Sequence, residues 1–142
     1  MKVSKLTPVK TDSTTTIQDL KDASSEFTKE RGWEKHHTAH NLVVSIAIEA
    51  AELMEHFQWG TEDFESHKLE IAHELADVIN YCMRFAEVTG IDISTSFYDK
   101  LEIIKLKYPT SIFNPESPGL DEYHNIKRST RQKKKQNEET NL

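Results

Sequence analysis

Two segments of the chain combine a helical hydrophobic period with a pair of acidic residues three positions apart. Separated by 21 residues, these pairs are Glu49 with Glu52 and Glu74 with Asp77. Through both segments, about residues 41–59 and 65–88, apolar side chains recur every three or four positions, which is typical of helices that bury one face. The spacing predicts two helices that pack side by side and bring the four carboxylates close together.

Two further segments have the same helical period. A capping pattern at Thr16 predicts a first helix that ends at Gly32, and Asp92 or Ser94 caps a last helix that ends before Pro109. The chain has only four Gly and four Pro, which favours helices over a sheet. We therefore predict an all-α protein, an antiparallel four-helix bundle that forms oligomers to cover its remaining apolar surface.

The expected organisation is one helical domain, residues 16–110, between an N-terminal arm, residues 1–15, and a C-terminal arm with a loose basic tail, residues 111–142. The last 19 residues hold six Lys or Arg and two acids, whereas the first 123 carry a net charge of −10. Such an acidic body is a poor non-specific binder of nucleic acid. The tail lacks apolar residues, which favours a disordered segment over a nucleic-acid-binding one.

Cysteine content and hydropathy indicate the compartment. The single cysteine, Cys82, excludes an internal disulfide framework and fits a reducing environment. No apolar run approaches the roughly 18 residues of a membrane span, and residues 1–10 do not resemble a signal peptide. A cytoplasmic protein without membrane contact is the expectation.

The position of the acids on their helices suggests that they bind a metal ion. At about 100° per residue, Glu49 falls beside Leu42 at the margin of the apolar stripe, and Glu74 falls beside Ile71. A partly buried carboxylate is costly unless it is paired or bound to metal. Oxygen ligands favour Mg²⁺ or Mn²⁺ over zinc. The chemistry that follows is metal-assisted hydrolysis of a phosphoanhydride.

The alternative is that these are ordinary solvated acids, because pairs at this spacing are common on helices rich in Glu. Against it, the only cations nearby in the sequence are Lys68 and Arg84, too few to neutralise four carboxylates. Periodicity alone does not decide between a metal site and solvated surface acids.

Matches to a known family extend beyond the acids. An E-x-x-E pattern followed by E-x-x-D is filled by the four acids, and the other matching positions are Glu26-Phe27, Glu30-Arg31, Trp33-Glu34, Asn41-Leu42, Phe57-Gln58-Trp59, Val78, Tyr81, Lys100 and Tyr108-Pro109. Over roughly residues 17–110, the chain resembles the MazG-like superfamily of all-α nucleoside triphosphate pyrophosphohydrolases, especially its dCTP pyrophosphatase branch. Two positions depart from that branch, Ser24 in place of a histidine and Ile104 in place of an asparagine, so the resemblance does not extend to the choice of base.

The resemblance implies a Mg²⁺-dependent enzyme, with Mn²⁺ as a substitute, that converts nucleoside triphosphates to monophosphate and pyrophosphate in nucleotide-pool house-cleaning. It implies a dimer or tetramer whose sites can draw on more than one subunit. The implied roles are metal binding for Glu49, Glu52, Glu74 and Asp77, catalysis for Glu49 and Glu52, base and sugar binding for Trp33, Trp59 and Tyr81, and phosphate binding for Lys100.

Other patterns leave alternatives. The histidines His36, His37 and His40 lack the cysteines and the second ligand pair of a zinc site, so a solvated loop is favoured, with His37 or His40 a possible phosphate contact. Glu70 and His73 match half of a di-iron motif, but no second copy is present. A di-iron bundle and a non-catalytic helical module for oligomerisation or nucleic-acid binding remain the alternative functions.

Overall fold

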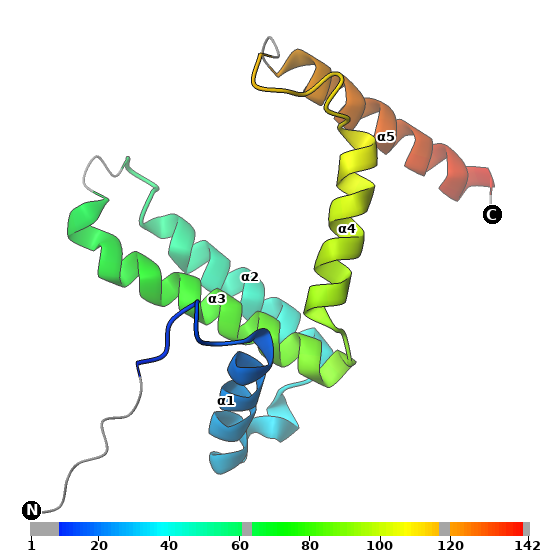
Figure 1. The fold of residues 1–142 in the computed structure, drawn as a ribbon. Helices are drawn as coiled ribbons and strands as arrows, with labels where there is room; N and C mark the ends of the chain where they lie inside the picture. Colours follow the sequence, from blue (N-terminus) through cyan, green and yellow to red (C-terminus); the bar gives the residue numbers. More distant parts are fainter. Residues whose placement is uncertain (1–8, 61–63, 117–119, 141–142) are drawn as a thin grey trace, which may run out of the picture. The chain divides into compact units, whose positions relative to one another are not determined.

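A computed structural model describes residues 9–60, 64–116 and 120–140 of the 142-residue chain. These residues form helices and no strand (Figure 1). The elements are α1 (Ile17–Glu30), η1 (Trp33–His36), α2 (Ala39–Glu55), η2 (Glu65–His67), α3 (Lys68–Thr89), α4 (Ile93–Lys107) and α5 (Asp121–Thr140). The all-α class is confirmed. Most of the predicted N-terminal arm and the end of the predicted tail, residues 141–142, lie outside the described residues.

Local capping explains where the first helices begin. The Thr16 hydroxyl accepts the Asp19 N–H at 3.1 Å, and the Asp19 carboxylate accepts the Thr16 N–H at 2.8 Å, which completes a capping box at the start of α1. Thr38 caps α2 in the same manner by accepting the Asn41 N–H at 3.2 Å. Gly90 ends α3 with a positive φ of 69°, a conformation that glycine adopts at no steric cost.

The end of α2 differs from the prediction, because the helix stops at Glu55 and not near Trp59. The N–H groups of Phe57 and Gln58 donate to carbonyls three residues earlier, at 3.0 and 3.1 Å. Such tightened turns satisfy the last carbonyls of a helix without extending it. Trp59 therefore lies in a turn beyond α2, and Gly60 follows with a φ of 78°.

The chain divides into two units, residues 1–94 and 95–142. In the first unit, α2 and α3 pack along each other as a hairpin, and α1 packs on α3 (Figure 1). Its buried apolar side chains are Leu42, Ile71, Met83 and Ala86. The hairpin was predicted from the sequence, whereas α4, expected as the fourth helix of a bundle, lies in the second unit apart from its first two residues.

Truncation of Leu42, which is 1% exposed, is expected to be strongly destabilising. We expect Leu42→Ala to lower the free energy of unfolding by about 2–5 kcal/mol, because it leaves a cavity between packed helices. Val9 is 82% exposed, so Val9→Ala is a matched control that should change stability by less than about 0.5 kcal/mol. Chemical denaturation measures both, and equal losses would contradict this description of the core.

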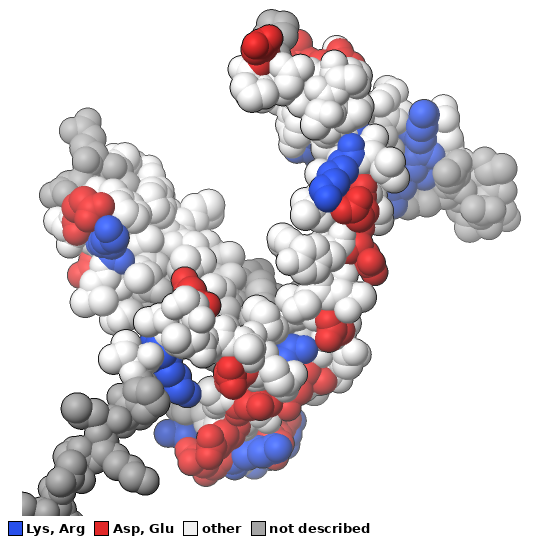
Figure 2. Space-filling view, in the orientation of Figure 1, with Lys and Arg blue, Asp and Glu red and all other residues white. Residues whose placement is uncertain are grey.

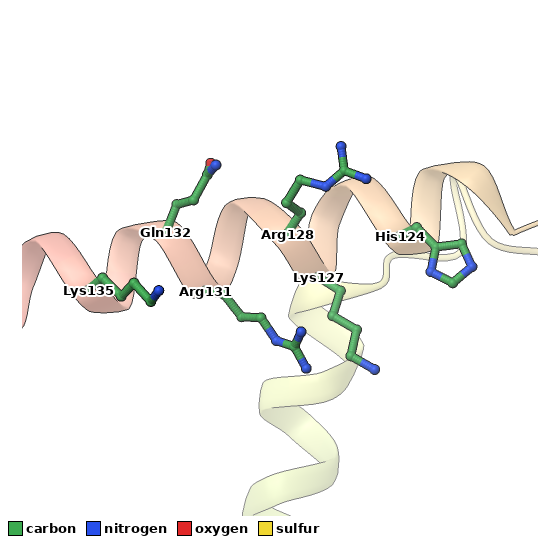
Figure 3. A pocket seen from close by; sticks show the side chains of 6 residues that line it. All are labelled: His124, Lys127, Arg128, Arg131, Gln132 and Lys135. Atoms are coloured by element: carbon green, nitrogen blue, oxygen red, sulfur yellow. The ribbon is translucent and has the colours of Figure 1, made fainter.

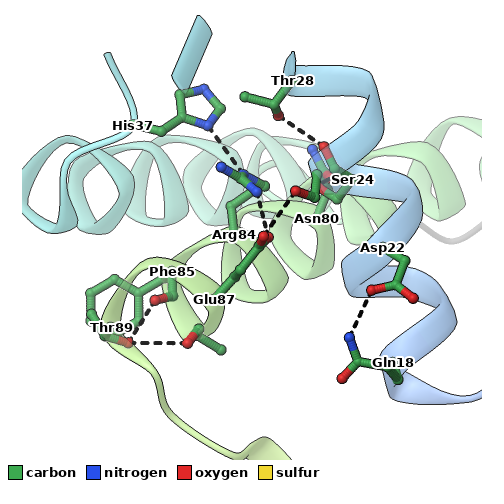
Figure 4. Close-up of polar contacts among 12 residues, drawn as sticks. Gln18, Asp22, Ser24, Thr28, His37, Asn80, Arg84, Phe85, Glu87 and Thr89 are labelled. Carbon is green, nitrogen blue, oxygen red and sulfur yellow. Dashed lines mark hydrogen bonds and ion pairs between the residues drawn. The ribbon is translucent and has the colours of Figure 1, made fainter. Parts of the chain in front are cut away.

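The interface between α1 and α3 is polar. The Ser24 hydroxyl donates to the side-chain oxygen of Asn80 (Figure 4), and the Ser25 hydroxyl donates to Glu87 at 2.8 Å. Thr28, also buried, donates to the Ser24 carbonyl at 2.8 Å. Because buried hydroxyls are costly unless bonded, the two bonds from Ser24 and Ser25 help to fix how α1 sits on α3, whereas the bond of Thr28 lies within α1. Ser24, which stands where the dCTP pyrophosphatase branch has a histidine, therefore contributes to the contact between α1 and α3.

In the second unit, Tyr108, the residue after α4, stacks on Tyr123 of α5 with ring centroids 5.4 Å apart. Helix α5 occupies much of the segment for which a loose tail was expected. Its many Lys, Arg, Gln and Glu residues have high intrinsic helix propensity, so a lack of apolar residues did not exclude a helix. Lys and Arg side chains follow α5 (Figure 2), and a hollow along it is lined by His124, Lys127, Arg128, Arg131, Gln132 and Lys135 (Figure 3). The boundaries of the arms and the domain stay predictions.

Candidate metal centre

The α2–α3 hairpin brings three acidic side chains together. Glu49 comes from α2, and Glu74 and Asp77 come from adjacent turns of α3. One carboxylate oxygen of each lies within 4.8 Å of the other two. Glu49 and Glu74 are half-buried and Asp77 is exposed, so the group opens to solvent on one side. Such spacing leaves room for a cation between the oxygens.

Glu52 lies on α2 one turn beyond Glu49, is exposed, and is outside this group of three. Its charge still acts on the group. Burial raises the pKa of Glu49, and the negative charges of Glu52, Asp77 and Glu74 raise this pKa further, in that order. Each of the other three predicted acids therefore acts electrostatically on Glu49, although only Glu74 and Asp77 converge with it.

No side chain in the described part of the chain neutralises these acids, since none of its ion pairs includes any of the four. The two cations considered from the sequence have other partners. Lys68 pairs with Glu65 at 3.1 Å, and Arg84 pairs with Glu87. Like charges held together without a counter-charge fit a cation site, and three carboxylates suit a hard divalent ion.

The other metal hypotheses find less support. Within the described ranges, no group of three or more His, Cys or acidic residues other than Glu49, Glu74 and Asp77 has converging ligand atoms. Glu70 pairs with His67, at 2.9 Å. The half di-iron motif is therefore not completed by the folding of these residues.

The three predicted aromatic residues lie at different places in the first unit. Trp33 begins η1 and meets Phe27 edge-on at 5.8 Å, whereas Trp59 is 89% exposed beyond the other end of α2. Tyr81 is half-buried on α3, one turn beyond Asp77, and its ring lies 6.4 Å from that of His37. The 17 residues of α2 span about 25 Å, so one chain does not bring both tryptophans to the same base.

Two other sequence-predicted positions lie in the second unit. Lys100 is exposed on α4, and its contact with phosphate stays a prediction. Ile104 lies one turn further along the same helix.

Sequence reasoning missed the contacts of Arg84, which is 3% exposed and reaches both Glu87 and His37. The available signal was its position between Met83 and Phe85 on a stretch of α3 that is otherwise apolar. A charge there is rare unless it is paired.

None of the helices in the described ranges has the length and apolar content that a membrane span requires.

Comparisons with known proteins identify the family. The model of the MazG-like family matches residues 44–112. The crystal structure of a pyrophosphatase from Archaeoglobus fulgidus DSM 4304 aligns with a TM-score of 0.62 and 39% identity, over 66% of this chain and 92% of that one. Human dCTP pyrophosphatase 1 is 28% identical over 109 residues, and the rat protein is 28% identical over 104. These matches cover 72% and 68% of this chain, but only 64% and 61% of the length of those relatives. With the all-α fold and the acid motif in place, the chain belongs to the MazG-like family, near its dCTP pyrophosphatase branch.

Proposed function

We propose that this protein is a Mg²⁺-dependent nucleoside triphosphate pyrophosphohydrolase that releases monophosphate and pyrophosphate. The observation that carries the proposal is the convergence of Glu49, Glu74 and Asp77 without a neutralising cation. The similarity to proteins named pyrophosphatase supports it. We place its role in house-cleaning of the cytoplasmic nucleotide pool, where the free thiol of Cys82 is compatible with the reducing environment.

The four acids have different proposed roles according to their positions. Glu49, Glu74 and Asp77 would hold the ion from both helices of the hairpin, and the half-buried setting of Glu49 and Glu74 would strengthen its attraction to them. A bound divalent ion supplies charge neutralisation of the triphosphate and makes a water molecule more acidic. Glu52, exposed one turn from Glu49, accepts a hydrogen bond from the attacking water and orients it towards the phosphorus.

The nucleoside part binds beside the aromatic residues, at about 1–3 kcal/mol for each ring that stacks on the base. Because α2 separates Trp33 from Trp59 by its full length, a base stacked between two tryptophans takes them from two copies of the chain. We therefore propose a homo-oligomer, a dimer or a tetramer. Lys100 contributes charge to a phosphate.

A screen for pyrophosphate release tests this function. The full-length protein is incubated with each common and modified (d)NTP in Mg²⁺, in Mn²⁺ and in excess chelator. We expect equimolar pyrophosphate and monophosphate from at least one substrate, and none with chelator. Release of single phosphate only, or no turnover of any nucleotide with either metal, would refute the proposal.

A further inference from the structure

Arg84 is a buried cation that the proposed chemistry does not use. It is 3% exposed on α3, and its guanidinium pairs with Glu87, which also accepts a hydrogen bond from Ser25 at 2.8 Å. Its Nε donates to Nδ1 of His37 at 3.4 Å (Figure 4). One line of contacts thus runs from α1 through α3 to the residue that precedes the cap of α2.

This contact determines which nitrogen of His37 carries the proton. A guanidinium only donates hydrogen bonds and stays protonated in proteins, so Nδ1 must offer its lone pair. The neutral ring then carries its hydrogen on Nε2. Consistent with an uncharged ring, burial lowers the pKa of His37, and the charges of Arg84 and His36 lower it further.

His37 also lies beside the candidate site. Its ring is 6.4 Å from that of Tyr81, and Tyr81 lies one turn beyond Asp77. The seven residues from Asp77 to Arg84 correspond to about 10 Å along α3. A nucleotide whose phosphates lie at the acids can therefore extend its sugar and base towards His37.

We propose that Arg84 is a positioning residue that fixes His37 as the Nε2–H tautomer, so that His37 donates an uncharged hydrogen bond to an oxygen of the nucleoside part of the substrate. The identity of the ligand rests on the proposed function, whereas the tautomer of His37 rests only on its contact with Arg84. A neutral donor binds a sugar or base oxygen without attracting the phosphates away from the acids.

The tautomer is measured first, by two-bond ¹H–¹⁵N correlation NMR on the ¹⁵N-labelled full chain, with the His37 signals assigned from His37→Gln. We expect the Nε2–H form in the wild type and a mixture of tautomers in Arg84→Met/Glu87→Gln, a double variant that leaves no unpaired charge. Ser25→Ala is the matched control, since it weakens the α1–α3 contact and keeps the Arg84–His37 bond. An Nδ1–H tautomer in the wild type would overturn the proposal.

Kinetics then tests the ligand. His37→Ala and the double variant should raise KM for the nucleotide by about 3- to 10-fold, the effect of losing one neutral hydrogen bond, with kcat within about twofold. Inhibition by inorganic tripolyphosphate should not change. An unchanged KM in a folded variant, or an equal loss of tripolyphosphate inhibition, would overturn the nucleoside contact. If the proposed function failed, no nucleotide would be turned over, and the NMR result would still decide the tautomer.

Discussion

Asp77→Asn is expected to lower metal-dependent pyrophosphate release by at least about 100-fold while the helices remain formed. Asp77 supplies one of three converging carboxylates, and the amide that replaces it has no charge to hold a divalent ion. Metal ions provide several kcal/mol of charge stabilisation in such reactions, and each 1.36 kcal/mol is a factor of ten in rate. Steady-state kinetics in saturating Mg²⁺, with circular dichroism for the fold, measures the effect.

The matched control is Glu70→Gln, which removes an acid from the same helix. Glu70 is exposed and pairs with His67, outside the group of three. Its loss should leave turnover within about twofold of wild type, because paired surface charges contribute little. Comparable losses in both variants would mean that general acidity of the surface, and not a defined site, supports the activity.

The second large effect is on stability. Because Glu49 has a raised pKa in the folded state, the folded protein binds more protons than the unfolded chain between the ordinary glutamate pKa, about 4.3, and the raised value. The free energy of unfolding therefore falls as pH rises through this window. Above the window Glu49 is fully ionised, and the folded state carries the whole cost of ionising it. Bound Mg²⁺ favours the ionised carboxylate and removes the penalty. The Mg²⁺-induced rise in Tm should be largest above the window and should vanish as pH falls through it.

Thermal unfolding between pH 4 and pH 8, with and without Mg²⁺, measures how the Mg²⁺-induced rise in Tm depends on pH. Glu49→Gln should abolish the Mg²⁺-induced rise and should be at least as stable as wild type without metal, because it relieves repulsion among the acids. Glu55→Gln, an exposed acid on the same helix, should retain the wild-type behaviour. A Mg²⁺ effect that survives in Glu49→Gln would exclude Glu49 as a ligand.

The hairpin was predictable because its causes are local. Helical periodicity, a Thr cap and a glycine stop set α2 and α3, and a short connection makes them neighbours. The meeting of Glu49 with Glu74 and Asp77 follows from their matching places on the two stripes. Whether Glu52 joins them depends on side-chain directions across the interface, which a helical wheel does not fix.

Other features depend on partners distant in the sequence. The i, i+3 spacing on α3 accounts for the pair of Arg84 with Glu87, but nothing near Arg84 in the chain indicates that His37 would accept a hydrogen bond from the same guanidinium, because His37 lies on a turn before another helix. The separation of Trp33 from Trp59 follows directly from the length of α2. It bears on function only if both tryptophans stack on the same nucleotide base. Helix α5 has a local cause, the high helix propensity of its residues. The lack of an apolar stripe had nevertheless predicted a loose tail there.

The most direct test of the metal centre is a crystal structure of the full chain grown with Mn²⁺, with anomalous diffraction collected to locate the ion. We expect an anomalous peak between α2 and α3, with carboxylate oxygens of Glu49, Glu74 and Asp77 as ligands. Saturating Mn²⁺ that leaves this position without a peak, or that binds only at other residues, would contradict the account.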